Sequence, residues 1–541
     1  HQGRFLDDIL NGIYSICEET AWQLPAHNSY IRDTPQLILP DVTRPVMDLF
    51  ACETGALLAC AAYLLEEEFN AVSPFILTCI EDNLKRRILL PYLTAHFWWM
   101  GHDDEPMCNW TVWCTQNVLL TTFLMPWSVE MSSRLSSPVR TFCGNAPLFL
   151  PENTSDTVVT LQAILHKAAE SCDYFLKDYG NDGCCEEGAQ YYRHAGLCLY
   201  GAMTVLNTVT DGHFDTLFRW DKVKNIASYI LNVHVNDKYY FNFADCSPIA
   251  GRAGVREYLF GKATGQEDLC LFAAKDFQAG QGQLVTDEVN GGNLFYRMQT
   301  VFHYEELMQQ NTSGTLSHRD VYYPSVGLFL VHSDTLDLAV KAGDNADSHN
   351  HNDTGSITLY KNGLPILADI GVETYTRKTF SPRRYEIWTM QSGYHNLPTI
   401  CGTDQKDGVE YRAENVMTVL TGAEPSISME LAAAYPAAQA IVPDLTYVRR
   451  VTLKKSSNTV VLEDHTNAQD VILNFITYEK PVILSDGKLS IGEASASFEG
   501  ADLLAIETLP ITDARLKTAW DHDLYRIRLK GSDAGFRLTI Q

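Results

Sequence analysis

The sequence SHNHNDTGS at residues 348–356 is the most informative stretch of this chain. His349 and His351 are two residues apart, so on one β-strand their side chains would face the same side of the sheet. Further along, an apolar run ends at Asp369, and His395 follows another strand-like run. His351, Asp369 and His395 therefore predict a two-histidine, one-carboxylate metal site, for which zinc is well suited. We expect His349 to lie beside the metal without binding it, so that its imidazole is available for another role.

Polar positions after this stretch extend the pattern. LPILAD (364–369), RYEIW (384–388) and SGYHN (392–396) follow it along the chain. The combination H-x-H-N-D-x-G-S-x-x-L-Y-x-x-G-x-P-I-L-x-D-x-G resembles the β-sheet domain of the heparinase II/III-like polysaccharide lyases, which include heparin, heparan sulfate and alginate lyases. The alternative is that these histidines are ordinary polar residues of a β-sandwich. That is usual for a single histidine, but so many ligand-type residues rarely gather by chance.

The part of the chain before residue 312 is expected to be helical, because apolar residues recur there at three- and four-residue steps. The predicted helices are Gly55–Glu68, Pro74–Thr94, Trp110–Met125, Asp156–Tyr179, Tyr191–Thr210, Trp220–Val235, Arg256–Gln278 and Gly292–Gln309. Antiparallel helix hairpins of this length form bundles, solenoids or closed rings. The resemblance to the lyases implies an incomplete (α/α) toroid over residues 1–312.

After about residue 313 the sequence pattern changes: the apolar segments become short and rich in Val, Ile, Leu, Tyr and Thr. The predicted strands are Val321–His332, Leu336–Lys341, Ser356–Tyr360, Leu364–Ile370, Val416–Leu420, Val448–Lys454, Thr459–Glu463, Val471–Tyr478, Lys488–Ile491 and Leu524–Leu529. They predict an antiparallel β-sandwich over residues 313–541. The fold class is therefore a multidomain α+β protein, helical first and sheet-forming second.

The chain has 541 residues and a formal net charge of −26. Nucleic acid is excluded as a partner, because phosphate binding needs a basic surface. An anionic membrane surface is disfavoured for the same reason, and no transmembrane span is expected, since no run of about 18 apolar residues is present. Arg377, Lys378, Arg383 and Arg384 nevertheless lie close together just before His395. They form either a solvated basic loop or a site that recognises carboxylate or sulfate groups.

The cysteines bear on the compartment. Thirteen of the 14 precede residue 271, and many lie in apolar helical runs, which favours buried free thiols over a disulfide framework. This pattern favours a reducing, cytoplasmic location. The alternative is a periplasmic or secreted protein whose signal peptide has been removed, because the chain does not begin with Met. The sequence leaves the oligomeric state open.

The segment EGAQYYRHAG at residues 187–196 is the first catalytic candidate in the helical half. It opens a helix after a loop rich in Gly and Cys, and it resembles the E-G-x-x-Y segment that carries the catalytic tyrosine of these lyases. Tyr191 is therefore the favoured acid and base, with Tyr192 as the alternative and a plain core role as the other possibility. Tyr192, Arg193 and His194 are assigned to substrate contacts.

A second candidate segment is CNWTVWC at residues 108–114. It resembles the family segment whose Asn or His contacts the substrate carboxylate, so Asn109 is assigned to neutralise that charge. A helix N-cap is the other role for Asn109, and the two can coexist. His102 is the alternative neutraliser, because some relatives use His. Further pocket residues with a weaker signal are Asn242 and Asp245, and after them His27 and Asn28.

The resemblance implies cleavage of a uronic-acid glycan by β-elimination, which leaves a 4,5-unsaturated sugar. One group removes the C5 proton, a second neutralises the carboxylate and a third protonates the C4 oxygen. His349 would act across the cleft from Tyr191, oriented by Asn350, Asn352 and Asp353, and the zinc ion would be structural. We expect no organic cofactor, and a heparin-like, heparan sulfate-like or alginate oligosaccharide cleaved from its end.

Two other classes remain open. A non-catalytic glycan-binding protein on the same scaffold would release no product. A metal-dependent hydrolase would need an open metal position with a bound water and would lose turnover with its metal. A lyase differs from both, because its unsaturated product absorbs ultraviolet light.

Overall fold

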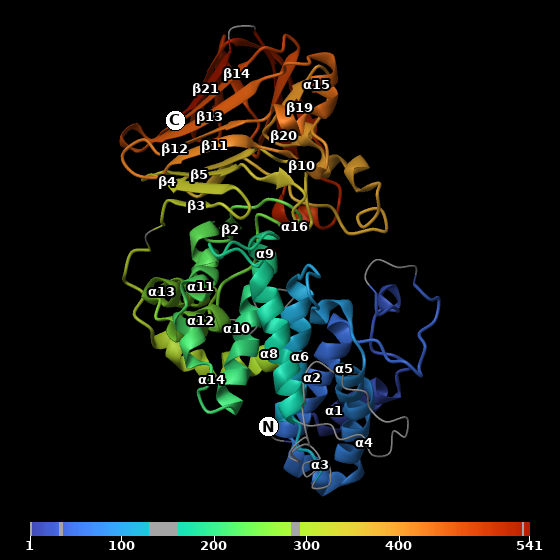
Figure 1. Ribbon diagram of the computed structural model, residues 1–541. Coiled ribbons are helices and arrows are strands. Elements are labelled where there is room, and N and C mark those ends of the chain that lie inside the picture. The colour runs from blue at the N-terminus through green and yellow to red at the C-terminus, as the bar shows by residue number, and fades with distance from the viewer. Residues whose placement is uncertain (1–2, 32–35, 129–160, 283–292, 317, 533–534) are drawn as a thin grey trace.

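A computed structural model describes residues 3–31, 36–128, 161–282, 293–316, 318–532 and 535–541. Helices fill the first part of the chain and antiparallel sheets the second, and in Figure 1 the sheets stand above the helices. The helices are α1 (Leu6–Glu18), α2 (Leu49–Leu64), α3 (Glu66–Val72), α4 (Phe75–Leu84), α5 (Leu90–Thr94), α6 (Asn109–Leu124), α8 (Leu161–Asp178), α9 (Gly188–Tyr192), α10 (Gly196–Val209), α11 (Asp221–Val233), α12 (Val255–Thr264), α13 (Glu267–Ala279), α14 (Leu294–Gln309), α15 (Pro436–Ile441) and α16 (Leu516–Ala519).

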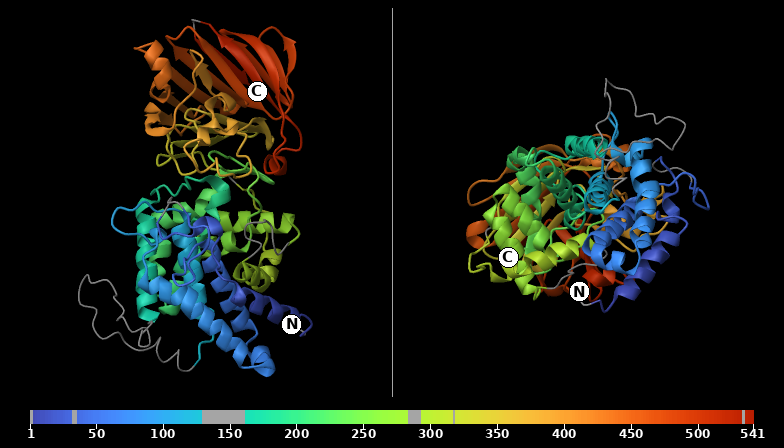
Figure 2. Two further views of the ribbon diagram at one scale, coloured as in Figure 1. Left: turned by 90° about the vertical axis from the view of Figure 1, so that its right-hand side faces the viewer. Right: turned by 90° about the horizontal axis from the view of Figure 1, so that it is seen from below.

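The helices of the first part pack side by side in a definite order. Helix α2 contacts α6, α6 contacts α10, α10 contacts α12, α12 contacts α14, and α14 contacts α2 again. Helices α8, α11 and α13 pack against members of this series, and the view from below in Figure 2 shows them grouped around one another. Helix α6 is buried along most of its length, as its place at the centre of these contacts requires.

Several predicted helices differ from the structure. Gly55–Glu68 is divided between α2 and α3, Pro74–Thr94 between α4 and α5, and Tyr191–Thr210 between α9 and α10. The predicted helix Arg256–Gln278 is two helices, α12 and α13, because Gly265 adopts φ +70° and ends α12 in a left-handed cap. The predicted helix Trp220–Val235 ends at Val233, where a short strand begins. The first residues of the predicted helix Asp156–Tyr179 lie outside the described residues, and α8 is seen from Leu161 onward.

Every pairing between the described strands is antiparallel. The larger sheets have the orders β3-β4-β5-β7-β8, β11-β12-β13-β14-β21-β18-β17-β16 and β19-β20-β15-β9, and β1-β2 and β6-β10 are pairs. The strands are β1 (His234–Asn236), β2 (Tyr239–Tyr240), β3 (Val321–Tyr323), β4 (Leu328–His332), β5 (Leu336–Lys341), β6 (Asp344–Asn345), β7 (Ile357–Lys361), β8 (Leu364–Leu367), β9 (Pro398–Ile400), β10 (Gly408–Arg412), β11 (Glu414–Val419), β12 (Ser426–Glu430), β13 (Tyr447–Lys454), β14 (Thr459–Thr466), β15 (Val471–Thr477), β16 (Val482–Ser485), β17 (Lys488–Ile491), β18 (Ala494–Glu499), β19 (Ala501–Leu509), β20 (Leu524–Gly531) and β21 (Phe536–Ile540).

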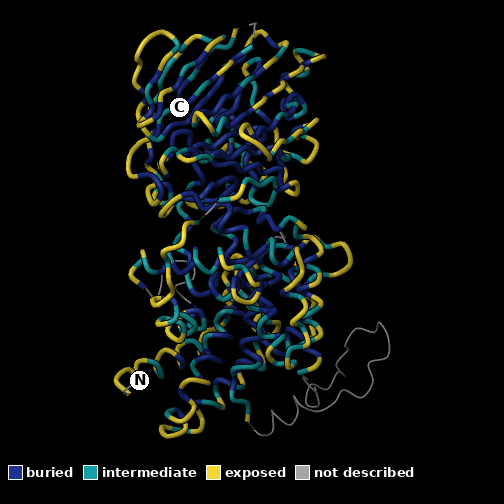
Figure 3. The backbone as a smooth tube through the Cα atoms, turned by 90° about the vertical axis from the view of Figure 1, so that its left-hand side faces the viewer, coloured by how far each residue is buried: buried dark blue, intermediate teal, exposed yellow. Residues whose placement is uncertain are grey.

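Strand β4 joins the two parts of the molecule, because both of its faces are buried. Leu328 and Leu330 pack into the core that the helices form, whereas Phe329 and Val331 pack into the core between the sheets. This follows from the alternation of side chains along a strand. Figure 3 shows buried backbone continuing through this level of the molecule. The predicted strand Val321–His332 is two strands in the structure, β3 and β4, which pair as a hairpin.

Within the described residues, no single helix is both long and apolar enough to cross a membrane. Helices α2 and α3 pass such a test only when taken together, and they meet at an angle of 80°.

Candidate active site

The candidate site is centred on Asp245, which lies in the loop that follows β2 and is fully buried. Its carboxylate oxygens lie 2.8 Å from Nδ1 of His349 and 3.0 Å from Nε2 of His351. Arg384 donates to it at 2.6 Å, and the hydroxyl of Tyr375 donates at 3.1 Å. Burial alone would raise the pKa of Asp245, but these two histidines and Arg384 hold it well below its usual value. Asp245 is thus a buried anion that orients groups from the sheet half.

The stretch that carries His349 and His351 is a loop between β6 and β7, so its prediction as a strand is wrong. His349 adopts φ +59°, in the left-handed region that residues other than glycine seldom occupy. The two histidines still converge, because each contacts a different oxygen of Asp245. Such backbone strain is retained where surrounding contacts hold it, and it is frequent at functional sites.

A buried ion pair supports this loop. Arg449 of β13, fully buried, pairs with Asp464 of β14 at 2.8 Å. Its Nη1 also donates to the backbone oxygens of Gly355 and Asn396, each at 2.8 Å. Gly355 ends the loop of His351, and Asn396 follows His395. One guanidinium therefore holds both histidine segments against the sheet.

Tyr191 faces this centre from the helical half. Its ring stacks on that of His349 with centroids 5.0 Å apart, and its hydroxyl lies 2.5 Å from the hydroxyl of Tyr375. Burial raises the pKa of Tyr191 to about 12, so the phenol keeps its proton at neutral pH. Tyr192, by contrast, is fully buried in the helical core and donates to the backbone oxygen of Ala227. The assignment of Tyr192 to substrate contact is corrected: it is a core residue.

His349 also approaches the helical half. Its Nε2 lies 3.5 Å from a carboxylate oxygen of Glu187, the residue just before α9. Burial opposes a charge on the imidazole, but the hydrogen bond with Asp245 and the charge of Glu187 together raise the pKa of His349. The ring therefore lies between two carboxylates, with Tyr191 stacked against it.

The predicted metal residues His351, Asp369 and His395 come together, with one potential ligand atom from each within 4.8 Å of the others. All three are buried, and Nδ1 of His395 lies 2.9 Å from Asp369. Nδ1 of His351 and Nε2 of His395 have no hydrogen-bond partner among the described residues. Asp369 lies two residues after the end of β8, His351 lies in the loop described above, and His395 follows a single helical turn, Ser392–Tyr394.

Asn242 belongs to the surroundings of this metal group rather than to the substrate. It is buried, and its amide donates to the side chain of Asp369 at 3.1 Å and to the backbone oxygen of Cys246 at 3.2 Å. The assignment of Asn242 to substrate binding is therefore corrected. A residue that holds a metal-binding carboxylate in place commonly sets metal affinity.

Asn109 is buried and is the first residue of α6, not its N-cap, which is Cys108. Trp113 lies one turn further on the same face of α6, and its ring is 4.1 Å from that of His194. His194 is in turn 6.4 Å from the ring of Tyr191. This places Asn109 on the side of α6 that faces α9. No described contact joins it to Tyr191 or His349.

Other predicted substrate residues occupy different environments. Arg193 is buried and pairs with Glu257 at 3.2 Å, which makes it part of the helical core and corrects its assignment. His102 is exposed and pairs with Asp103 at 2.9 Å. Of the two predicted long-range candidates at the N-terminus, His27 bonds to Asp48 and Asn28 bonds to Gln23, away from Asp245.

The basic cluster divides into parts with different roles. Arg384 turns inward to Asp245, whereas Arg383 is 70% exposed and pairs with Glu386 at 2.8 Å. Lys378 pairs with the same glutamate at 3.2 Å, and Arg377 is exposed. A cavity of about 290 Å³ lies beside this segment, lined among others by Glu373, Thr376, Lys378, Thr379 and Trp388.

Tyr375 and Arg515 are site residues that the sequence did not indicate. The hydroxyl of Tyr375 lies near Tyr191, Asp245 and, at 3.3 Å, Nδ1 of His349. The guanidinium of Arg515 lies 4.4 Å from the centre of the Tyr375 ring. The only sequence signal for Tyr375 was its place in the basic segment. Arg515 lies more than 100 residues after the motif at residues 348–396, so only the folded structure shows that it belongs to the site.

The chain is similar to known proteins in sequence and in fold. Residues 315–471 match the model of the heparinase II/III-like C-terminal domain family. This match confirms the resemblance seen in residues 348–396. A comparison with curated proteins gave no significant match.

Solved structures of lyases share the fold. A mutant heparan sulfate lyase HepC from Pedobacter heparinus has a TM-score of 0.53 at 11% identity, over 90% of this chain and 68% of that chain. A heparinase III gene product has a TM-score of 0.53 at 14% identity, over 90% and 67%. A mutant chondroitin AC lyase from Streptomyces coelicolor A3 has a TM-score of 0.52 at 10% identity, over 100% and 71%. These likenesses establish a mixed helical and antiparallel-sheet architecture of this type.

Proposed function

We propose that the protein is a polysaccharide lyase that cleaves a uronic-acid-containing glycan by β-elimination. The observation that carries the proposal is the meeting of Tyr191, from the helical half, with His349, from the sheet half, at a ring distance of 5.0 Å. A phenol that holds its proton and an imidazole between two carboxylates form an acid and base pair. The match to the heparinase II/III-like domain and the glycan-lyase neighbours support the same reaction class.

In the proposed reaction, Nε2 of His349 takes the C5 proton of the sugar and Tyr191 gives its proton to the C4 oxygen. The C5–H and C4–O bonds break, the C4=C5 bond forms, and the leaving sugar departs with a hydroxyl group. Asp245 and Glu187 stabilise the imidazolium that forms. The hydroxyl of Tyr375 lies close to both Tyr191 and Nδ1 of His349 and links the two groups in one hydrogen-bonded chain. Between turnovers Nε2 of His349 releases the proton it took, and Tyr191 regains one by exchange with solvent.

Asn109 is proposed to bind the sugar carboxylate, as in the E-G-x-x-Y and N-W pattern of the family. It starts α6 on the face that also presents Trp113 to His194. An amide donor there would offset the negative charge that develops when the C5 proton leaves. The cavity beside Lys378 would receive further sugar hydroxyls.

The metal group suits a structural ion better than a catalytic one. His351 and His395 are fully buried and Asp369 is 3% exposed, which leaves no access for a glycan. The partnerless imidazole nitrogens and the carboxylate fit zinc. Zinc bound there would tie the three segments together, and His351 would transmit that order to Asp245 through its Nε2. This favours the lyase over a metal-dependent hydrolase.

Finer features remain parts of the proposal. The closed order of helix contacts supports an (α/α) toroid, and the core shared by the sheets supports a β-sandwich. The proposed substrate is a heparin-like, heparan sulfate-like or alginate oligosaccharide. We propose that it is cleaved from its end and that the reaction takes place in the cytoplasm. The predicted division into residues 1–312 and 313–541 remains a prediction.

The test is incubation of the full chain with heparan sulfate, heparin, chondroitin sulfate and alginate, followed by ultraviolet absorbance of the unsaturated product. We expect absorbance to rise with at least one of them, and mass spectrometry to show products formed without addition of water. Cleavage that adds water would instead establish a hydrolase. Binding without cleavage across the panel would favour the glycan-binding alternative.

A further inference from the structure

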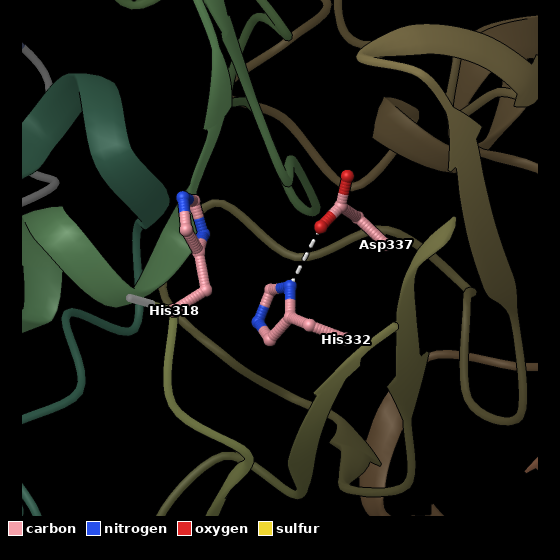
Figure 4. Close-up of side chains that lie close together, drawn as sticks. All are labelled: His318, His332 and Asp337. Carbon is pink, nitrogen blue, oxygen red and sulfur yellow. Dashed lines mark hydrogen bonds and ion pairs between the residues drawn. The ribbon is translucent and has the colours of Figure 1, made fainter. Parts of the chain in front are cut away.

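A second histidine cluster lies away from the candidate active site, at the first sheet. His332 ends β4 and pairs across the hairpin with Asp337 of β5, with its Nδ1 2.8 Å from the carboxylate. His318 comes from the connection that leads from α14 to β3, and its ring is 4.9 Å from that of His332. Figure 4 shows the three side chains converging from three separate segments. One potential ligand atom from each lies within 4.8 Å of the other two.

The imidazoles of this cluster have unused nitrogens. His332 is 8% exposed, and its Nε2 is buried without a hydrogen-bond partner among the described residues. Nδ1 of His318 is in the same condition. A buried polar atom without a hydrogen-bond partner costs free energy. Such an atom in a folded protein therefore indicates either a cost that the fold retains or a ligand bound there. Because Asp337 now contacts Nδ1 of His332, an ion would replace that hydrogen bond and lie between this nitrogen, the carboxylate and a nitrogen of His318. Two imidazoles and one carboxylate are donors that a transition metal uses.

The surroundings hold the three donors in place. The backbone amide of His332 donates to Asp320, whose other oxygen pairs with Lys455 at 2.5 Å. On the far side, the ring of His234 from β1 lies 6.1 Å from that of His318 and is inclined to it by 28°. Asp337 is 18% exposed at its side chain, so an ion can reach the cluster from solvent.

We propose that His318, His332 and Asp337 bind a divalent transition-metal ion, with zinc as the best-fitting ion. Two neutral imidazoles and one carboxylate leave a net positive charge on the ion and a fourth position for water. The three ligands come from the connection after the helices and from both strands of the β4–β5 hairpin. The ion would therefore fasten the end of the helical half to the first sheet. It touches none of the groups around Asp245, so its role is structural.

The test must separate this ion from one at His351, Asp369 and His395. The full chain carrying His351→Ala is freed of metal with a chelator and titrated with zinc alone, by calorimetry and elemental analysis. We expect about one bound zinc ion per chain. Adding His332→Ala or Asp337→Asn should weaken that binding at least tenfold, whereas adding His213→Ala, a change at an exposed histidine, should not.

The same four proteins are then melted with and without zinc. Zinc should raise the melting temperature of the His351→Ala chain and of its His213→Ala derivative, but not of the His332→Ala or Asp337→Asn derivatives. Asp337→Asn preserves the shape of the side chain and guards against a variant that fails to fold. Unchanged zinc affinity in both cluster variants, or no zinc binding in the parent, would overturn the proposal.

Discussion

Two clusters of two histidines and one aspartate lie in this protein, and they differ in what surrounds them. His351, Asp369 and His395 are buried inside a dense network, which includes Asn242 and, through His351, Asp245. His318, His332 and Asp337 lie at a seam that is partly open to solvent. The ligand chemistry is the same, but only the first cluster is linked to groups that can move protons. The function of such a cluster is therefore set by its neighbours.

The largest expected effect is a loss of turnover when Tyr191, which lies near the first cluster, is changed. Tyr191→Phe keeps the ring stacked on His349 and removes only the hydroxyl, so we expect turnover to fall about 10²–10⁴-fold. Initial rates from product absorbance measure it. Tyr192→Phe is the matched control, because that hydroxyl reaches only a backbone oxygen in the core.

His332→Ala extends the same comparison to the second cluster. It should leave turnover within about threefold, since a structural ion there acts on no reacting group. If Tyr192→Phe proved inactive while Tyr191→Phe retained more than about a third of the rate, the catalytic tyrosine would be reassigned. A loss of turnover in His332→Ala equal to that of Tyr191→Phe would remove the distinction between the clusters.

The next effect concerns stability. Arg449→Met leaves the buried Asp464 with only the hydroxyl of Tyr447 as a side-chain donor and without a compensating charge, and it removes the donors to Gly355 and Asn396. We therefore expect the free energy of unfolding to fall by about 3–5 kcal/mol. Denaturant unfolding followed by circular dichroism measures it. The counterpart at the second cluster is Lys455→Met, which breaks a partly exposed pair with Asp320 and should cost about 0–1 kcal/mol. Equal losses would mean that the two clusters are supported alike.

The first cluster could be predicted from the sequence because its ligands fall within one short motif with recognisable spacing. The second could not, because His318, His332 and Asp337 carry no motif and meet only when the connection after α14 folds against a hairpin. The same limit applies to Tyr375 and Arg515, which reach the site by tertiary folding. Tyr191 and Tyr192 lie side by side in the sequence, and a short helix sends them to opposite environments. Periodicity located the long helices of the first part and about half of the strands. It missed the short strands β1, β2, β6 and β9, and also β10, β12, β16, β18, β19 and β21. Strands of two or three residues are too short to show a period, and the small residues of β18 give little apolar signal.

A smaller effect is expected on metal affinity at the first cluster. Asn242→Leu removes the amide that holds Asp369, so zinc should bind about 10–100-fold more weakly there. Calorimetric titration in a His332→Ala background measures this cluster alone. Asn232→Leu is the control, because it removes a buried amide that bonds to Tyr323 instead. Equal affinities in the two variants would show that Asn242 does not order the ligands.

The smallest expected effect separates two adjacent arginines. Arg383 is exposed and held by Glu386, whereas Arg384 donates to Asp245 and to the backbone oxygen of Asn350. Arg383→Gln should therefore change turnover and the Michaelis constant by less than about twofold, because an exposed pair contributes little. Arg384→Gln removes a charged hydrogen bond from a buried carboxylate and should lower turnover clearly, with the steady-state kinetics of both variants measured on the same glycan. A strong rise in the Michaelis constant of Arg383→Gln alone would show that this arginine leaves Glu386 to bind the sugar, and the basic loop would then belong to substrate recognition after all.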